Sequence, residues 1–319
     1  MTPQRVVVAL GGNALSPSGG TGDVHEMRAA LEATAESLAD LVEQGVSLVV
    51  THGNGPQVGR ILLQQEYAAA QVPPMPMDVC GAQSQGQIGY LLAQTLDGAM
   101  ARRGLSARAL CLVTQVVVDG RDPAFRRPTK PVGPAYDRAG ARQIAHQTGY
   151  VFRVMPDSRW RRVVPSPAPL RIVEAEPLRQ IVEAGHVVVA AGGGGVPVVE
   201  LEGAFHGVEA VIDKDLTAAR LALLIDADQL VILTEISRVQ IGFGTPSARD
   251  LTRLTAAAAE SLLEAGEFPD GSMGPKVRAC VDFVTAGGRR AVIGSLGAAR
   301  DVVFGDAGTV FVALGSESG

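Results

Sequence analysis

The chain has 319 residues, of which 46% are hydrophobic and 19% charged, so it is long enough for one large α/β domain or two lobes. Its formal net charge of −5 argues against a basic surface for nucleic acid or an anionic membrane. No apolar run approaches the ~20 residues of a membrane-spanning helix, and the three cysteines form no CxxC pair. We therefore expect a cytoplasmic protein that binds neither membranes nor nucleic acids.

Apolar runs and segments with helical spacing alternate along the first part of the chain. The strands that we expect are Arg5–Leu10, Val46–Thr51 and Ala109–Val118. The helices that we expect are His25–Gln44, one that begins near Gln57, and Ser84–Arg103. Fully apolar strands that alternate with helices are typical of a parallel sheet covered on both faces.

Residues 119–173 interrupt this alternation with eight prolines and many arginines. One helix is expected at Asp137–Gln147, and short strands are expected near Val151–Val154 and Arg162–Val164. The stretch is longer than an ordinary connection, and its aromatic residues, Trp160 among them, need a packed environment. It therefore predicts a small inserted subdomain.

The rest of the chain resumes the alternation. The strands that we expect are Val187–Ala191, Gln229–Thr234, Arg290–Gly294 and Thr309–Leu314. The helices that we expect are Pro177–Ala184, Asp213–Leu224, Thr255–Glu264 and Pro275–Ala286. Together the two parts predict a two-lobed α/β sandwich with glycine turns at the strand ends.

Glycine-rich turns occur at four places, after apolar strands or before helices. They are Gly11-Gly12-Asn13, Gly53-Asn54-Gly55, Gly192–Gly195 and Gly271–Gly274. Such turns present backbone N–H groups and the positive end of a helix dipole to anions. None matches the GxxxxGK[ST] loop or the GxGxxG fingerprint, so nucleotide binding would need another scheme.

Lysine is rare in this chain, because only three of the 28 basic residues are Lys and the others are Arg. Lys214 and Lys276 fall in the first turn of expected helices, where a cation opposes the helix dipole. Lys130 lies between Pro128 and Pro131, which restrict its backbone. A compact ammonium in such positions indicates that the three lysines hold a small anionic substrate for phosphoryl transfer.

Three polar residues beside these lysines and turns have competing interpretations. Asp215, next to Lys214, could organise the lysines or could be a favourable first-turn carboxylate, and we favour the first role. Asp213 is ranked below it, since an N-cap role explains that residue equally well. His52 could be a base, but beside a glycine turn a histidine more often orders the loop.

Eight longer stretches carry a resemblance to a known family. They are Val7–Leu15, Thr51–Gly59, Asp78–Ala82, Pro128–Pro134, Arg161–Pro167, Gly192–Val198, Glu209–Asp215 and Gly271–Val277. Over nearly its whole length the chain resembles the carbamate kinases, within the amino acid kinase superfamily. The resemblance is specific, because the matching stretches are long, follow the family's order along the chain and are spread over both halves.

The resemblance implies a three-layer α/β/α sandwich with a mainly parallel central sheet and a small inserted lid subdomain, usually as a homodimer. The implied reaction is reversible phosphoryl transfer between ATP and carbamate, with Mg²⁺ held mainly by the nucleotide phosphates and by no protein metal site. The chain would be a single amino acid kinase-type domain. Its parts would be residues 1–118 and 174–205 on the carbamoyl side, 119–173 as the protruding insert, and 206–319 on the nucleotide side.

Carried over by position, the resemblance also assigns site residues. The catalytic residues would be Lys130, Lys214, Asp215 and Lys276. The substrate, carbamate or carbamoyl phosphate, would be bound by Gly11, Gly12, Asn13, Gly53 and Asn54. ATP or ADP would be bound by Lys214, Met273, Gly274 and Lys276.

One segment departs from the family pattern and keeps other interpretations open. Residues Thr234–Gln240 replace the aspartates and tyrosine that the family more often has near the nucleotide. A catalytically weak or silent nucleotide or metabolite sensor on the same fold is therefore one alternative, against which the intact lysines argue. A kinase for another small carboxylate is a second alternative, but the proline-flanked Lys130 favours the carbamate branch.

Overall fold

The structure is a computed structural model that describes residues 3–15, 23–269 and 271–313. Its centre is an eight-stranded sheet with the order β15-β17-β16-β12-β1-β2-β9-β3. In that order the strands are Arg253–Thr255, Thr309–Val312, Arg290–Ser295, Gln229–Thr234, Arg5–Leu10, Ser47–His52, Val187–Val189 and Ala109–Cys111. Within the described ranges all neighbours in this sheet pair in parallel except β16 and β17. The mainly parallel sheet that was predicted is confirmed.

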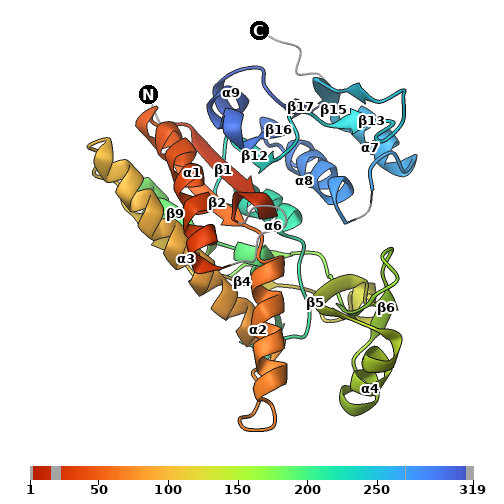
Figure 1. The fold of residues 1–319 in the computed structure, drawn as a ribbon. Coiled ribbons are helices and arrows are strands. Elements are labelled where there is room, and N and C mark those ends of the chain that lie inside the picture. The colour runs from red at the N-terminus through yellow and green to blue at the C-terminus, as the bar shows by residue number, and fades with distance from the viewer. Residues whose placement is uncertain (1–2, 16–22, 270, 314–319) are drawn as a thin grey trace.

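Helices cover both faces of this sheet, and strand β1 shows how the two layers are separated (Figure 1). Val6, Val8 and Leu10 pack into one hydrophobic cluster, while Val7 and Ala9 pack into a second cluster on the other face. The first cluster contains α1 (Val24–Glu43), α3 (Met77–Arg102) and α9 (Ala299–Phe304). The second contains α5 (Ala175–Glu183), α6 (Lys214–Leu224), α7 (Ala256–Glu264) and α8 (Met273–Thr285). Alternate side chains of a strand point to opposite faces, so this division gives the three-layer α/β/α sandwich.

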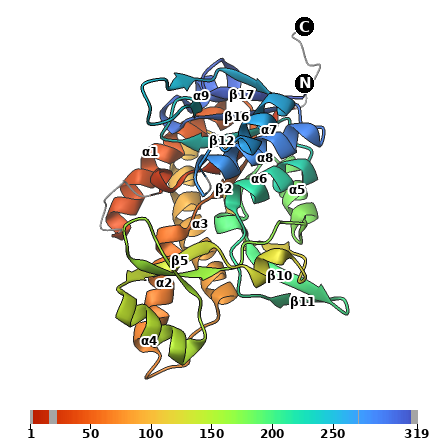
Figure 2. The ribbon, with the colours of Figure 1, turned by 90° about the vertical axis from the view of Figure 1, so that its right-hand side faces the viewer.

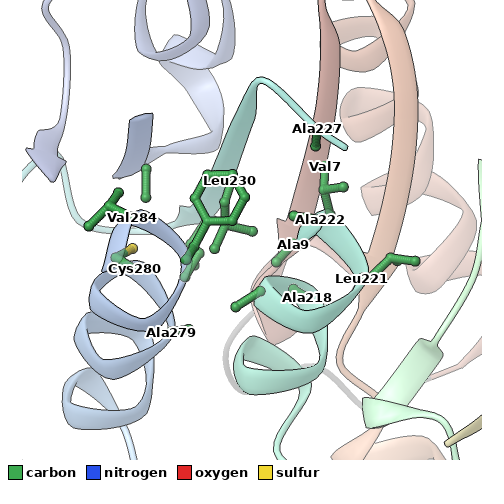
Figure 3. Packing of buried hydrophobic residues seen from close by; sticks show 14 of the residues in the cluster. Val7, Ala9, Ala218, Leu221, Ala222, Ala227, Leu230, Ala279, Cys280 and Val284 are labelled. Carbon is green, nitrogen blue, oxygen red and sulfur yellow. The ribbon is translucent and has the colours of Figure 1, made fainter. Parts of the chain in front are cut away.

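Small side chains let α6 lie close to the sheet. Figure 3 shows Ala218 and Ala222 of α6 beside Val7 and Ala9 of β1, and all four are fully buried. Helix α8 packs next to α6, with Ala279 on the same buried side. The close packing fixes the position of both helices, and therefore of their N-terminal turns, relative to the strand ends.

The inserted subdomain has a sheet of its own and stands away from the central sheet (Figure 2). Its antiparallel strands β5, β7 and β6 are Lys130–Tyr136, Trp160–Val164 and Phe152–Val154, and its helix α4 is Arg138–Thr148. The Tyr136 hydroxyl donates a hydrogen bond of 2.6 Å to Glu66 on α2 (Gly55–Ala68). The subdomain is therefore docked on α2 and has an ordered fold, as its aromatic residues predicted.

The prediction of one long strand at Ala109–Val118 is wrong. Residues 109–111 form β3 of the central sheet, whereas β4 (Gln115–Val117) belongs to a separate four-stranded sheet. Between them, the backbone N–H of Thr114 donates to the Gln85 side chain (3.0 Å), and its Oγ1 accepts from the N–H of Ala191 (3.0 Å). At Thr114 these hydrogen bonds replace the pairing with a neighbouring strand, so the chain leaves the central sheet and enters the four-stranded sheet.

The remaining elements are short. The four-stranded sheet also contains β8, β10 and β11, which are Arg171–Ile172, Val196–Leu201 and Ala204–Gly207. A hairpin is formed by β13 and β14, which are Gln240–Ile241 and Arg249–Asp250. The 3₁₀ turns are Gly12–Ala14, Pro123–Arg126, Gly192–Gly194 and Leu296–Ala298. In the part of the chain that the structure describes, no helix is long and apolar enough to cross a membrane.

Candidate active site

A cavity of about 540 Å³ lies where the inserted subdomain meets the main body. Its walls are the turn after β2 with the start of α2, strand β5, residues 211–215 at the start of α6, and the start of α8. Six of the predicted site residues line this main cavity, namely Gly53, Asn54, Lys130, Lys214, Asp215 and Lys276. Segments from four parts of the sequence therefore bring all three lysines to one place.

The lysine cluster of Lys214, Asp215 and Lys276 is the most buried charged group in this cavity. The Asp215 side chain is only 4% exposed and accepts from Lys214 Nζ at 2.6 Å and from Lys276 Nζ at 2.9 Å. One carboxylate thus spaces two ammonium groups, as expected for an organiser of the lysines. Since two cations face one anion, the cluster keeps an excess of positive charge for a ligand.

Burial and pairing act in opposite directions on the pKa values of this cluster. Burial lowers the pKa of Lys214, and the repulsion of Lys276 adds to this effect, whereas Asp215 opposes it. Burial raises the pKa of Asp215, but the two ammonium groups outweigh burial and hold that pKa below its ordinary value. Asp215 therefore stays ionised at neutral pH and keeps the two ammonium groups together.

Lys130 reaches the cavity from the inserted subdomain and meets a partner that the sequence did not suggest. Its Nζ donates to Asp213 Oδ2 at 2.9 Å, across 83 positions of the chain. The other oxygen of Asp213 accepts from the backbone N–H of Asp215 at 3.0 Å, which confirms Asp213 as the N-cap of α6. Because the partners lie so far apart in sequence, no local pattern could have revealed the ion pair.

Three helices begin at the cavity, but their first turns differ. Asp213 caps α6, whereas among the described residues neither Asn54 nor Ser272 caps its helix, α2 or α8, through a side-chain hydrogen bond. The Asn54 side chain instead donates to Ser84 Oγ at 2.8 Å. First-turn N–H groups have no partner inside their own helix. The start of α2 is thus suited to bind an anion, with Lys214 beside it. At the start of α8 the carbonyl of Pro269 accepts from the N–H groups of Ser272 and Gly274, so the anion attraction there rests mainly on Lys276.

The turn Gly192–Gly195 serves close packing more than ligand exposure. A Cβ on Gly193 would lie 2.1 Å from the Asn54 side-chain nitrogen, and one on Gly194 would lie 2.2 Å from the carbonyl oxygen of Ile212. Gly192 and Gly194 are buried, and Gly193 alone of the four lines the main cavity. The expected anion cradle is therefore mainly a packing site, where the turn positions Asn54 and the chain that enters α6.

Two of the three remaining predicted substrate residues, Gly11 and Gly12, lie outside the main cavity. Gly11 and Gly12 line a separate cavity of about 260 Å³ together with Thr234 and Glu235. The N–H of Gly11 donates to the carbonyl of Leu233 at 2.9 Å, so its closest neighbour is β12. Asn13 lies in the 3₁₀ turn Gly12–Ala14, and its side chain is outside the described part of the structure.

The two other predicted nucleotide residues lie at the start of α8. Met273 lines a third cavity of about 280 Å³, while buried Gly274 donates its N–H to the carbonyl of Pro269 at 3.0 Å. The apolar wall of this third cavity consists of Ile236, Phe243, Phe268, Pro269 and Met273. It shares Ser272 and Lys276 with the main cavity. The atypical segment 234–240 thus borders a largely apolar space next to the lysine cluster.

His52 lies at the end of β2 directly behind the cavity and is buried. Its ring Nδ1 lies 2.8 Å from the carbonyl oxygen of Gly53, so the protonated Nδ1 donates to that carbonyl. The pKa of His52 is lowered to about 4, chiefly by burial; the bond to Gly53 opposes this shift, and the charge of Lys214 contributes to it. A histidine that is neutral and enclosed in this way orders the turn, which favours the loop-ordering role.

The comparisons with known proteins agree with this geometry. A model of the amino acid kinase family matches residues 4–295. The carbamate kinase of Pyrococcus horikoshii is 46% identical over 309 residues, which cover 96% of this chain and 98% of the relative. The solved structure of a carbamate kinase from Giardia lamblia bound to AMP-PNP has a TM-score of 0.92 at 39% identity, and the match covers 98% of this chain and 100% of that chain. The chain belongs to the amino acid kinase family and, within it, to the carbamate kinases.

Proposed function

We propose that the protein catalyses reversible phosphoryl transfer between ATP and carbamate, so that carbamoyl phosphate and ADP give ATP and carbamate. The observation that carries the proposal is the arrangement of three lysines around one cavity, between the starts of α2 and α8. One anion at the start of α2 and a second beside Lys276 would bring the two phosphate-bearing partners together next to Lys214. This is the arrangement that transfer from one phosphate to another requires.

The carbamoyl side of the cavity would be the turn after β2. The stem of Lys214 passes over Gly53, because a Cβ there would lie 3.6 Å from its Cδ and Cε atoms, an ordinary van der Waals distance. The first-turn N–H groups of α2 and the ammonium of Lys130 would bind the anionic oxygens of carbamoyl phosphate. The assignment of Gly53, Asn54 and Lys130 to the substrate is retained in this proposal. Gly11, Gly12 and Asn13 stay predictions.

The nucleotide side would be the start of α8 and the third cavity. Lys276 would bind the phosphates, and the apolar wall with Phe243 and Met273 would hold the base. Because Ser272 and Lys276 line both cavities, a nucleotide in the third cavity would point its phosphates into the main one. The altered segment 234–240 is compatible with nucleotide binding, since it contributes Ile236 to the apolar wall.

Catalysis would rest on positioning and charge. Phosphoryl transfer needs in-line alignment and stabilisation of the charge on the moving group, and little covalent help from the protein. Lys214 and Lys276 are already spaced by Asp215 before any ligand binds, so they need no reorganisation. Each such donor is worth ~2–4 kcal/mol of transition-state stabilisation, by analogy with preorganised donors in other enzymes.

The residues present fit a magnesium ion that arrives with the nucleotide. Mg²⁺ prefers oxygen ligands, but the two carboxylates among the described residues of the main cavity already accept from ammonium groups, Asp213 from Lys130 and Asp215 from Lys214 and Lys276. The phosphates and water would therefore supply most ligands of the ion. When bound, it would neutralise part of the phosphate charge.

The direct test is ATP formation from ADP and carbamoyl phosphate with Mg²⁺, with acetyl phosphate as the control substrate. We expect turnover with carbamoyl phosphate that greatly exceeds turnover with acetyl phosphate. Nucleotide binding without any turnover by folded protein would contradict the proposal and favour the sensor. Preference for another carboxyl phosphate would favour the related kinase.

The Lys130→Ala variant tests which side of the main cavity binds the substrate and which side binds the nucleotide. Lys130→Ala should lose most of its activity with carbamoyl phosphate while ADP binding is largely kept, because Lys130 lies on the substrate side. Equal losses of turnover and ADP binding would place Lys130 with the nucleotide instead. The homodimer, the cytoplasmic location and the division into residues 1–118 with 174–205, 119–173 and 206–319 also belong to this proposal.

A further inference from the structure

Among the described residues of the main cavity, only Asp213 both caps a helix and forms an ion pair with the inserted subdomain. Its Oδ1 caps α6 by accepting from the N–H of Asp215, and its Oδ2 accepts from Lys130 Nζ at 2.9 Å. The Asp213 side chain is 14% exposed and that of Lys130 is 32% exposed, so water competes with this ion pair less than with a surface pair. The pair joins the inserted subdomain to the helix that carries Lys214.

The ion pair fixes where the ammonium of Lys130 lies. The backbone of Lys130 is set by β5, in which it pairs with Val164 of β7. The side chain beyond it is long and flexible, and an unpaired lysine loses much rotamer freedom when a ligand orders it. An ammonium has three N–H donors, and in the described structure Asp213 takes one of them. The others can then meet an anion that enters an already ordered site.

We propose that Asp213 is a positioning residue for the phosphoryl transfer: it holds the ammonium of Lys130 in the cavity before the anionic substrate binds. This inference rests on the proposed function and assigns a further residue to the same site. Asp213 and Asp215 lie two positions apart on one helix end, so together they fix the spacing of all three ammonium groups.

A carboxylate beside an anion site also has an opposite effect, because it repels the ligand. Among the described residues, the charged ones that line the main cavity are Arg60, Lys130, Arg161, Asp213, Lys214, Asp215 and Lys276. Cations outnumber carboxylates in this set, so the cavity stays positive with Asp213 ionised. We therefore expect the positioning of Lys130 by Asp213 to favour the reaction more than the negative charge of Asp213 disfavours binding of the anion.

The variant that separates positioning from capping is Asp213→Asn. Asparagine caps helices about as well as aspartate, so α6 keeps its cap, while the charge that holds Lys130 is lost. We expect kcat/KM for carbamoyl phosphate to fall about tenfold, which corresponds to ~1.4 kcal/mol. The KM for ADP should stay unchanged. The matched control is Asp137→Asn, which alters the N-cap of α4 in the inserted subdomain and should leave all rate constants unchanged.

A double-mutant cycle with Lys130→Ala then tests the mechanism. If Asp213 acts through Lys130, Asp213→Asn adds little to the loss already caused by Lys130→Ala. A tenfold loss that persists in the Lys130→Ala background overturns the inference, because a purely structural role would give that result. An unchanged or higher kcat/KM for Asp213→Asn also overturns it, since repulsion of the anion would then dominate.

Two further measurements distinguish a failure of this inference about Asp213 from a failure of the proposed function. Turnover by the unmodified protein tests the function itself. If the unmodified protein shows no turnover, the affinity of each variant for carbamoyl phosphate is measured by calorimetric titration. Equal affinities of Asp213→Asn and the unmodified protein overturn the inference. If Asp213→Asn melts far below the unmodified protein, Asp213→Ser keeps an N-cap and replaces it in each comparison.

Discussion

The buried His52 makes the stability of this protein depend on pH in a defined window. Its pKa is about 6.5 in an unfolded chain and about 4 in the folded protein, chiefly because burial disfavours the charged ring. The unfolded chain therefore binds a proton between these pH values that the folded protein does not bind. Stability contributed by this difference is complete above pH ~6.5 and is lost as the pH falls towards ~4.

The size of the effect follows from these two pKa values. The full difference corresponds to ~3 kcal/mol of unfolding free energy, and about 2 kcal/mol of it is lost between pH 7.5 and pH 5. This is a substantial part of the ~5–15 kcal/mol by which a typical domain is stable. Carboxylates titrate over an overlapping range, so the contribution of His52 has to be isolated by a variant.

The assay is urea unfolding at pH 7.5 and pH 5 for the unmodified protein, His52→Gln and His146→Gln. His52→Gln should show a loss of stability on acidification that is about 2 kcal/mol smaller than in the unmodified protein, whatever its stability at pH 7.5. The exposed His146 serves as the control and should change nothing. An equal pH dependence in His52→Gln would refute the reasoning. Should that variant not fold, the ring protons of His52 in the unmodified protein should show no NMR titration above pH 5.

Three further changes probe the cavity itself. Asp215→Asn leaves two ammonium groups without their carboxylate and should cost ~3–5 kcal/mol in urea unfolding; a change below 1 kcal/mol would mean that the lysines simply turn outwards. Lys276→Arg should lose most ATP-forming activity while its melting temperature stays within a few degrees, since a guanidinium cannot replace the compact ammonium; full activity would contradict this view of the lysines. Gly193→Ala places a Cβ 2.1 Å from the Asn54 side chain, so it should raise the KM for carbamoyl phosphate more than that for ADP; equal effects would argue against a substrate role of Asn54.

The elements that could be predicted are those whose pattern is local. Helix α1 was expected at His25–Gln44 and is found at Val24–Glu43, because its apolar spacing and Gly45 define it without help from other segments. The lysine cluster could be predicted for a similar reason, because the sequence alone places Lys214 and Lys276 in the first turns of two expected helices. The carboxyl ends of parallel strands then bring such turns together.

The features that escaped prediction depend on contacts between distant segments. Ala109–Val118 has an unbroken strand pattern, and only the bonds of Thr114 to Gln85 and Ala191 divide it between two sheets. Helix α3 begins at Met77, seven residues before Ser84, because its buried face continues from Met77 and Cys80 through the polar residues Ser84 and Gln85, which an apolar pattern does not reveal. The ion pair of Lys130 with Asp213 and the packing of Gly193 on Asn54 are likewise invisible, because each partner has an adequate local explanation.

The lysine cluster links the stability of the fold to its function. Two ammonium groups that share Asp215 repel each other, and burial further lowers the pKa of Lys214, so the ligand-free arrangement is electrostatically incomplete. A bound anion supplies the missing negative charge and should therefore favour the folded protein over the unfolded chain. Lys214 and Lys276 also oppose the dipoles of their own helices, a cost of folding that Asp215 offsets in part and that a bound anion would reduce further.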